Sequence, residues 1–248
     1  MEQNNFHTGF VSAMKLELSG EADRFDFQSG LSTKQDETIF DLMISKKESS
    51  KKQTDHMGPA FTTVNLYKYL STDESLNIGR FYKIMTSAQS FIDEHRSSYG
   101  LDYSHYSLSI VCDDKPYGIL SSVRLIDSAV KKFAPGFYEI ITCAPFRIQI
   151  IATSHLNDSH PWLGSLTKKA SASKLNGIML GLHKLDCELK ALAIPVFETF
   201  VRYNPALIKR METAQSEIYK NIKEMFPPDH LEETTNAAST GRVKIHTT

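Results

Sequence analysis

The chain has 248 residues, of which 41% are hydrophobic and 23% are charged, and both values are ordinary for a globular protein. Its formal net charge of −1 is not the basic excess typical of nucleic-acid-binding domains, so an anionic partner must be met by a local patch. No apolar run approaches the ~20 residues that cross a bilayer. We therefore expect one soluble, compact domain that needs no cofactor and contacts a membrane only peripherally.

The three cysteines form no recognisable metal or redox motif. Cys112, Cys143 and Cys187 are odd in number and far apart, no Cys-x-x-Cys pair occurs, and each lies beside apolar residues. Free cysteine is among the most buried residue types. We expect three buried, reduced thiols, and hence a cytosolic or nuclear protein.

The first part of the chain alternates between polar segments and extended apolar ones. Residues 1–9 are polar and are expected to form a flexible N-terminus. Residues 10–18 carry apolar side chains at alternate positions, which predicts a half-buried strand. Residues 45–59 are polar and basic, close with Gly58-Pro59 and predict a loop. Residues 61–70 then return to an extended, aromatic-rich pattern.

A helix between strands is predicted for the middle of the chain. Ser71 and Glu74 have the spacing of a capping box, and the apolar stripe from Phe81 to Ile92 has helical spacing and precedes Gly100. Residues 119–133 are ambiguous and favour a helix slightly. Alternating apolar residues predict further strands at 106–112, 137–143 and 146–153.

The C-terminal third is mostly helical in pattern. Alternation at 178–182 suggests one more strand, whereas residues 185–203 have helical spacing broken by Pro195. Asn204-Pro205 starts a further helix that runs to residue 226. We expect an α+β fold with a small mixed or antiparallel sheet, a packed helix and a helical C-terminal segment. It forms a single domain over 10–226, followed by a disordered tail at 227–248.

The sequence lacks the spacings of common catalytic and ligand-binding motifs. No Gly-rich phosphate loop, Gly-x-Ser-x-Gly or His-Glu-x-x-His occurs. His155, Asp158 and His160 could reach one metal ion, but loop histidines without thiolates are more often solvated. We therefore expect no metal.

Asp113-Asp114 and the neighbouring Cys112 are the remaining candidates for chemistry. Paired carboxylates can act as acid and base when buried together, although turn propensity explains these two more simply. A cysteine nucleophile needs a nearby positive charge, and two adjacent aspartates oppose a thiolate. The stripe from Phe81 to Ile92 could be a ligand wall, but core packing is the simpler interpretation. We expect no active site.

Two segments are candidates for partner contact. Lys46, Lys47, Lys51 and Lys52 form a basic cluster that could attract anionic lipid, act as a nuclear-import signal or nucleic-acid patch, or remain a solvated loop. The segment Pro161-Trp162-Leu163 holds the single tryptophan of the chain in a polar loop. An exposed tryptophan is a common anchor for self-association or partner binding, and the alternative is a tryptophan folded back onto the core.

The layout of residues 60–185 resembles that of rhabdovirus matrix proteins, in particular the longer, plant-infecting type. Residues 146–154 resemble the late β-strand of that family, the Pro161-Trp162-Leu163 segment follows as it does there, and 177–182 resemble the next strand. The strand–helix–strand order of residues 61–112 is similar as well.

This resemblance implies a structural role in a virion. Such proteins self-associate, bind the viral nucleocapsid, coat the inner face of the membrane and promote budding, without sequence-specific nucleic-acid binding. They occur in the host cytoplasm and in some cases the nucleus. Here Met1–Gly9 is neither basic nor proline-rich, and Pro227-Pro228 is not followed by the tyrosine of a PPxY-type late motif. The lysine cluster would therefore have to replace the basic arm.

Two other classes of function remain open on the sequence. One is a viral or host interaction protein, such as a movement protein or an adaptor, with a defined partner and no affinity for lipid. The other is an enzyme whose site is assembled from residues distant in the chain, which would show as a deep pocket lined by titratable groups.

Overall fold

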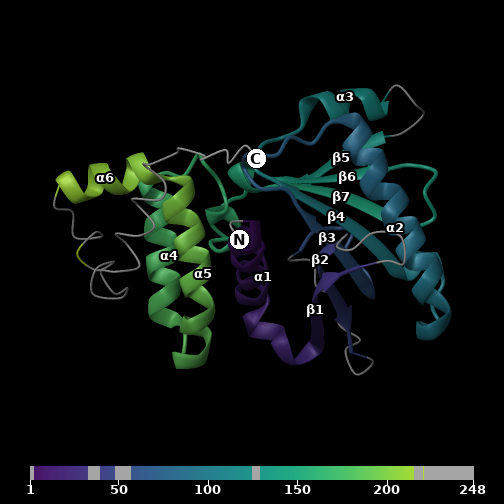
Figure 1. The fold of residues 1–248 in the computed structure, drawn as a ribbon, viewed down its shortest axis with the longest axis horizontal. Helices are drawn as coiled ribbons and strands as arrows, with labels where there is room; N and C mark the ends of the chain where they lie inside the picture. Colours follow the sequence, from purple (N-terminus) through teal and green to yellow (C-terminus); the bar gives the residue numbers. More distant parts are fainter. Residues whose placement is uncertain (1–2, 33–39, 48–56, 125–128, 215–219, 221–248) are drawn as a thin grey trace, which may run out of the picture.

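The computed structural model describes residues 3–32, 40–47, 57–124, 129–214 and 220. A seven-stranded mixed sheet in the order β1-β2-β3-β4-β7-β6-β5 lies between two layers of helices (Figure 1). The fold is α+β with a mixed sheet, which confirms the fold class predicted from the sequence.

The elements follow one another along the chain with mostly short connections. The strands are β1 (Phe25–Leu31), β2 (Phe40–Lys46), β3 (Val64–Tyr69), β4 (Tyr106–Cys112), β5 (Ala129–Ala134), β6 (Phe137–Ile141) and β7 (Arg147–Ala152). The α-helices are α1 (Gln3–Glu17), α2 (Ile78–Tyr99), α3 (Tyr117–Arg124), α4 (Ala172–Lys184), α5 (Cys187–Tyr203) and α6 (Pro205–Thr213). Short 3₁₀ turns include η1 (Ser19–Arg24) and η4 (Leu163–Ser165).

The centre of the sheet consists of three parallel strands, β3, β4 and β7. Helix α2 is the crossover between β3 and β4, and antiparallel pairs flank the parallel strands on both sides. Every residue of β4 is buried, as expected for a central strand covered on both faces. The strands predicted at 61–70, 106–112, 137–143 and 146–153 are confirmed as β3, β4, β6 and β7.

Each face of the sheet buries its own hydrophobic core. Leu66, Leu108 and Ile148 face the layer formed by α2, whereas Tyr67 and Ile151 face the layer that contains α1, α4 and α5. Both layers are visible in Figure 1, where α2 and α3 lie on one side of the sheet and α1, α4, α5 and α6 lie on the opposite side.

The strand predicted at residues 10–18 is wrong, because this segment belongs to helix α1. Apolar residues at 10, 14 and 18 satisfy a period of two and a period of 3.6 equally well. The helix buries Phe10, Ala13 and Met14 completely against the sheet and α5. The same helix begins at Gln3, so most of the segment 1–9 that was expected to be flexible is helical.

The strand predicted at residues 178–182 is also wrong, because these residues belong to helix α4. Leu175, Ile178, Met179 and Leu182 have helical spacing and are buried together, whereas Leu180 is exposed. In the ambiguous range 119–133, the structure has a helix followed by a strand, α3 and then β5.

Helix α2 begins later than the capping-box pattern indicates. Glu74 accepts a hydrogen bond from the backbone N–H of Ser71 at 2.9 Å, but this pair closes a local turn. The side chain of Asn77 caps the helix by accepting from Arg80 N at 2.9 Å. Gly100 ends the helix in the left-handed conformation at φ 64°, as predicted.

The C-terminal helices are confirmed where the structure describes them. Pro195 lies inside α5, and Pro205 is at the first turn of α6. The predicted continuation of α6 to residue 226 and the predicted tail at 227–248 lie outside the described residues, apart from residues 214 and 220.

Candidate functional surfaces

The predicted basic cluster is divided between a strand end and residues outside the described ranges. Lys46 is the last residue of β2, and its ammonium lies 5.2 Å from the centre of the Phe61 ring. Lys47 Nζ lies 3.6 Å from Asp26 Oδ1. Lys51 and Lys52 are outside the described residues. Of the two lysines that the structure describes here, Lys47 therefore has its charge partly offset by an acidic neighbour.

The alternative in which Trp162 folds back onto the core is confirmed, and the interpretation of Pro161-Trp162-Leu163 as an exposed anchor is wrong. Trp162 is 5% exposed and Leu163 is completely buried. The tryptophan ring lies over Gly181 of α4, where a Cβ atom would come within 2.9 Å of it. Leu163 N donates to the buried carboxylate of Glu17 at 2.8 Å, which ties this segment to α1. The segment is therefore part of the core.

The histidines of the same loop do not converge. His155 is exposed, whereas His160 is buried with its Nδ1 3.6 Å from Glu17 Oε2 and its ring 5.1 Å from that of Phe137. Within the described ranges there is no group of three histidine, cysteine or acidic side chains that could hold a metal ion.

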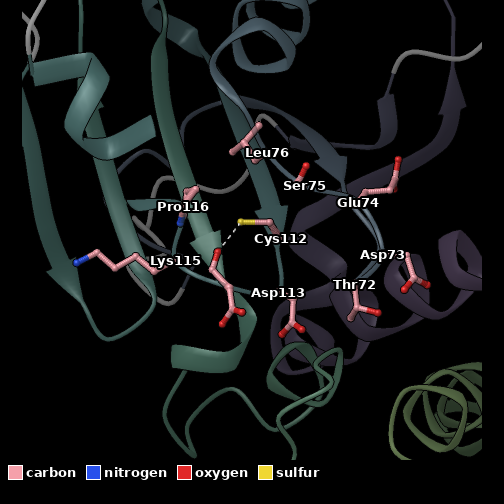
Figure 2. Close-up of a pocket in the computed structure, with 10 residues that line it drawn as sticks. Thr72, Asp73, Glu74, Ser75, Leu76, Cys112, Asp113, Lys115 and Pro116 are labelled. Atoms are coloured by element: carbon pink, nitrogen blue, oxygen red, sulfur yellow. Dashed lines mark hydrogen bonds between the residues drawn. The ribbon is translucent and has the colours of Figure 1, made fainter. Parts of the chain in front are cut away.

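A hollow of about 300 Å³ opens at the carboxyl ends of the parallel strands β3 and β4. This edge of a parallel sheet is where open α/β proteins commonly bind ligands. The walls are the two connections that leave these strands, residues 72–76 and 112–116, and Figure 2 shows their side chains around Cys112.

Cys112 in this hollow is a neutral thiol at physiological pH. Burial, together with the charges of Asp113 and Asp114, raises its pKa to about 12. Its Sγ donates to the backbone carbonyl of Asp114 at 3.2 Å, the dashed line in Figure 2. This agrees with the expectation that adjacent aspartates oppose a thiolate.

The carboxylates of the hollow are paired with neighbouring groups. Asp113 accepts from Thr167 Oγ1 and from Lys168 N at 3.2 Å. Asp114 accepts from Lys169 Nζ at 2.6 Å and from Ser154 Oγ at 3.1 Å, and the hydrogen bond from Lys169 holds its pKa below the usual range. These contacts fasten the connection after β4 to residues 167–169, and they leave the two aspartates in structural roles.

A second opening is mostly apolar, in contrast to the polar hollow at Cys112. A groove of about 420 Å³ lies between α2 and the connection from β6 to β7, with mostly apolar walls. Tyr82 on one wall is 37% exposed, and Cys143 and Pro145 on the other wall are exposed. The complete lining is Phe81, Tyr82, Met85, Thr86, Gln89, Thr142, Cys143, Ala144, Pro145 and Phe146.

Sequence reasoning did not predict this groove. The stripe from Phe81 to Ile92 is mainly core, as expected, but Phe81 and Met85 also line the groove. Tyr82 lies off the stripe, and such an off-stripe aromatic residue on an amphipathic helix is the signal that could have indicated an exposed apolar surface. Cys143 was expected to be buried, as was Cys187, and both are exposed.

Comparison with known proteins found no relative of this chain. No protein-family model, no characterised protein and no solved structure matches the chain. Among the described helices, none is both long and apolar enough to span a bilayer.

Proposed function

We propose that the chain is an assembly protein of the viral matrix type, which self-associates, binds the nucleocapsid and attaches peripherally to the inner face of the membrane. In this role it makes and breaks no covalent bonds. The observation that carries the proposal is the exposed apolar groove along α2, which we assign to self-association. Large exposed apolar surfaces on a folded domain typically mark protein–protein interfaces, and tyrosine and methionine are enriched there.

The groove suits contact with a second copy because it combines a protruding side chain with a hollow. Ile78 and Tyr82 are 38% and 37% exposed and are one turn apart on α2. The hollow between Met85 and the 142–146 connection lies directly beside them. In a dimer with two-fold symmetry, the tyrosine of each copy can enter the hollow of the other, since both features belong to one surface.

The resemblance to matrix proteins supports the proposal in part. The order β3-α2-β4 and the strand β7 occur where the resemblance implies them. The strand implied at 177–182 is a helix instead, so that element gives no support.

Sedimentation velocity over a range of protein concentrations tests the proposal. We expect the wild type to form dimers or larger species as concentration rises, and Tyr82→Asp to remain a monomer because a buried unpaired carboxylate is costly. Tyr117→Asp, which places the same change at a tyrosine 66% exposed and outside the groove, is the matched control. A wild type that stays monomeric at every concentration would overturn the proposal.

The alternative function is an interaction protein without affinity for lipid, and the same purified protein can distinguish it from the matrix-type role. A movement protein or adaptor would use the groove for a different partner. It would remain monomeric alone and would not bind vesicles. Both of these outcomes would favour the alternative over the matrix-type role.

A further inference from the structure

The β5–β6 hairpin presents two lysines and an aromatic ring to solvent. β5 is the last strand in the order of the sheet. Its residues Lys131, Lys132 and Phe133 are all exposed, and the phenylalanine is 48% exposed. The register shifts only after Lys132, so Lys131 and Lys132 keep the regular alternation and point to opposite faces of the sheet. Lys132 lies on the face of Tyr138, whereas Lys131 and Phe133 lie on the face of Phe137.

The positive charge of this hairpin is not neutralised by its neighbours. Within the part of the chain that the structure describes, neither Lys131 nor Lys132 has an ion pair or a hydrogen bond to its side chain. Glu139 lies opposite Lys131 in the register, but it accepts from Arg147 at 3.1 Å and 2.5 Å. The glutamate charge is thus already offset by the arginine.

A second basic and aromatic group adjoins the hairpin. Tyr138 lies opposite Lys132 on the neighbouring strand, and the ammonium of Lys115 is 5.2 Å from the Tyr138 ring. The same ammonium is 4.6 Å from the ring of Tyr117, which is 66% exposed at the start of α3. Figure 1 shows α3 beside the β5 end of the sheet. We call the combined surface the hairpin face. It wraps around the edge strand, with Lys131 and Phe133 on the side of Phe137 and with Lys132, Lys115 and Tyr117 on the side of Tyr138.

We propose that the hairpin face is the surface that contacts an anionic phospholipid bilayer. Lysine ammonium groups attract the anionic head groups, and exposed aromatic rings suit the boundary between head groups and hydrocarbon. Charge complementarity favours a membrane over nucleic acid. The chain as a whole has a net charge of −1, and the lysines lie around the end of one edge strand without the extended basic track that a single strand requires.

This inference rests on the proposed membrane attachment, but it concerns a surface separate from the groove. The hairpin turn at residues 134–137 and the groove wall at 142–146 follow opposite ends of β6. Lys131 and Lys132 lie opposite Glu139 and Tyr138, three and four residues before Thr142 of the groove wall, which is roughly 10–13 Å along the strand. A molecule can therefore contact a bilayer through the hairpin while its groove binds a second copy.

Vesicle flotation at low ionic strength tests the inference. The probes are vesicles of phosphatidylcholine with about a third phosphatidylserine, and vesicles of phosphatidylcholine alone. We expect wild-type protein to float with the anionic vesicles only, and less so as salt is added. Lys131→Glu/Lys132→Glu should reduce partitioning at least about tenfold, since each lysine near the surface contributes on the order of 1 kcal/mol and 1.4 kcal/mol corresponds to tenfold. Phe133→Ser should give a smaller reduction with the charge unchanged.

Matched controls separate this surface from general charge and from the groove. Lys184→Glu/Lys190→Glu makes the same charge change on exposed lysines of α4 and α5 and should float like the wild type. The Tyr82→Asp variant should still bind vesicles, and the hairpin variant should still self-associate, so the two proposals can fail independently.

Three results would overturn the inference. The first is equal flotation of the wild type and Lys131→Glu/Lys132→Glu. The second is flotation lost only when Lys46, Lys47, Lys51 and Lys52 are changed to alanine. The third is a wild type that binds single-stranded RNA through the hairpin lysines and does not float with either vesicle.

Discussion

The hydroxyl oxygens of Tyr69 and Tyr203 lie 2.9 Å apart and join the central sheet to the end of helix α5. Phe10 stacks on Tyr69 with ring centroids 4.9 Å apart, and Phe6 stacks on Tyr203 at 5.1 Å. Residues from three distant parts of the chain thus form one aromatic cluster. This cluster holds the helical layer that closes one face of the sheet.

Removing one hydroxyl of the pair should cost more than removing the other. Tyr203→Phe leaves the buried Tyr69 hydroxyl without this partner and should lower the free energy of unfolding by about 1–3 kcal/mol. Tyr69→Phe should cost less, because Tyr203 is less deeply buried than Tyr69, at 6% exposed against 1%. Urea unfolding followed by circular dichroism measures both values. If the two variants lost equal free energy of unfolding, the expected difference between the two hydroxyl groups would be wrong.

The same buried tyrosines should make the protein sensitive to alkali. Burial raises the pKa of Tyr67, Tyr69 and Tyr203 above the ordinary value of 10.0. A raised pKa means that the fold disfavours the phenolate, so this contribution to stability is complete below pH 10 and is lost as pH rises above it. We expect cooperative unfolding above pH 10 with simultaneous ionisation at 295 nm. Complete tyrosine ionisation with unchanged far-UV circular dichroism would contradict this.

Gly9 should be intolerant of a side chain because α1 and α5 are in close contact there. An added Cβ would lie 2.1 Å from Thr199 Oγ1 and 3.0 Å from the carbonyl oxygen of Pro195. Gly9→Ala should therefore destabilise the fold by about 1–3 kcal/mol, despite the better helix propensity of alanine.

Gly177 is the matched control for this substitution. It lies in helix α4 and has no atom within 4 Å of the Cβ position. Gly177→Ala should leave the free energy of unfolding unchanged or raise it by up to about 1 kcal/mol, and the melting temperature should change in the same direction. If both alanine variants melted alike, the close packing of α1 on α5 would be wrong.

The three thiols should react at two very different rates. Cys143 and Cys187 are exposed and should react with Ellman's reagent in the native protein. Cys112 is buried, and its pKa raised to about 12 keeps it protonated, so it should react only after unfolding. The count of reacted thiols should be two in native buffer and three in urea. A third fast thiol under native conditions would mean that the Cys112 hollow opens readily.

Elements were predicted correctly where the apolar residues fit only one period, that of a strand or that of a helix. The prediction failed where the same residues fit both periods. The central strands and helix α2 have clear patterns and were predicted correctly, including Gly100 at the helix end. Residues 10–18 and 178–182 alternate over a short stretch, and only packing against the sheet selects the helix. Neither error was detectable from local preference alone.

The surfaces were harder to predict than the fold, because exposure depends on residues distant in the chain. Trp162 is buried because Gly181 leaves room for its ring, and nothing near Trp162 in the sequence indicates this. The hairpin lysines were not recognised, since Lys131 and Lys132 form a shorter cluster than Lys46–Lys52. Their exposure follows from the edge position of β5.

Labelling of Cys143 tests the central claim, self-association through the groove, most directly. Cys143 lies in the groove wall, and Cys187 on α5 is an exposed reference thiol in the same molecule. As protein concentration is raised, the rate of maleimide labelling should fall at Cys143 and stay constant at Cys187, and Tyr82→Asp should abolish the difference. Unchanged labelling of Cys143 in a sample that sediments as a dimer or larger species would place the interface elsewhere and contradict the account.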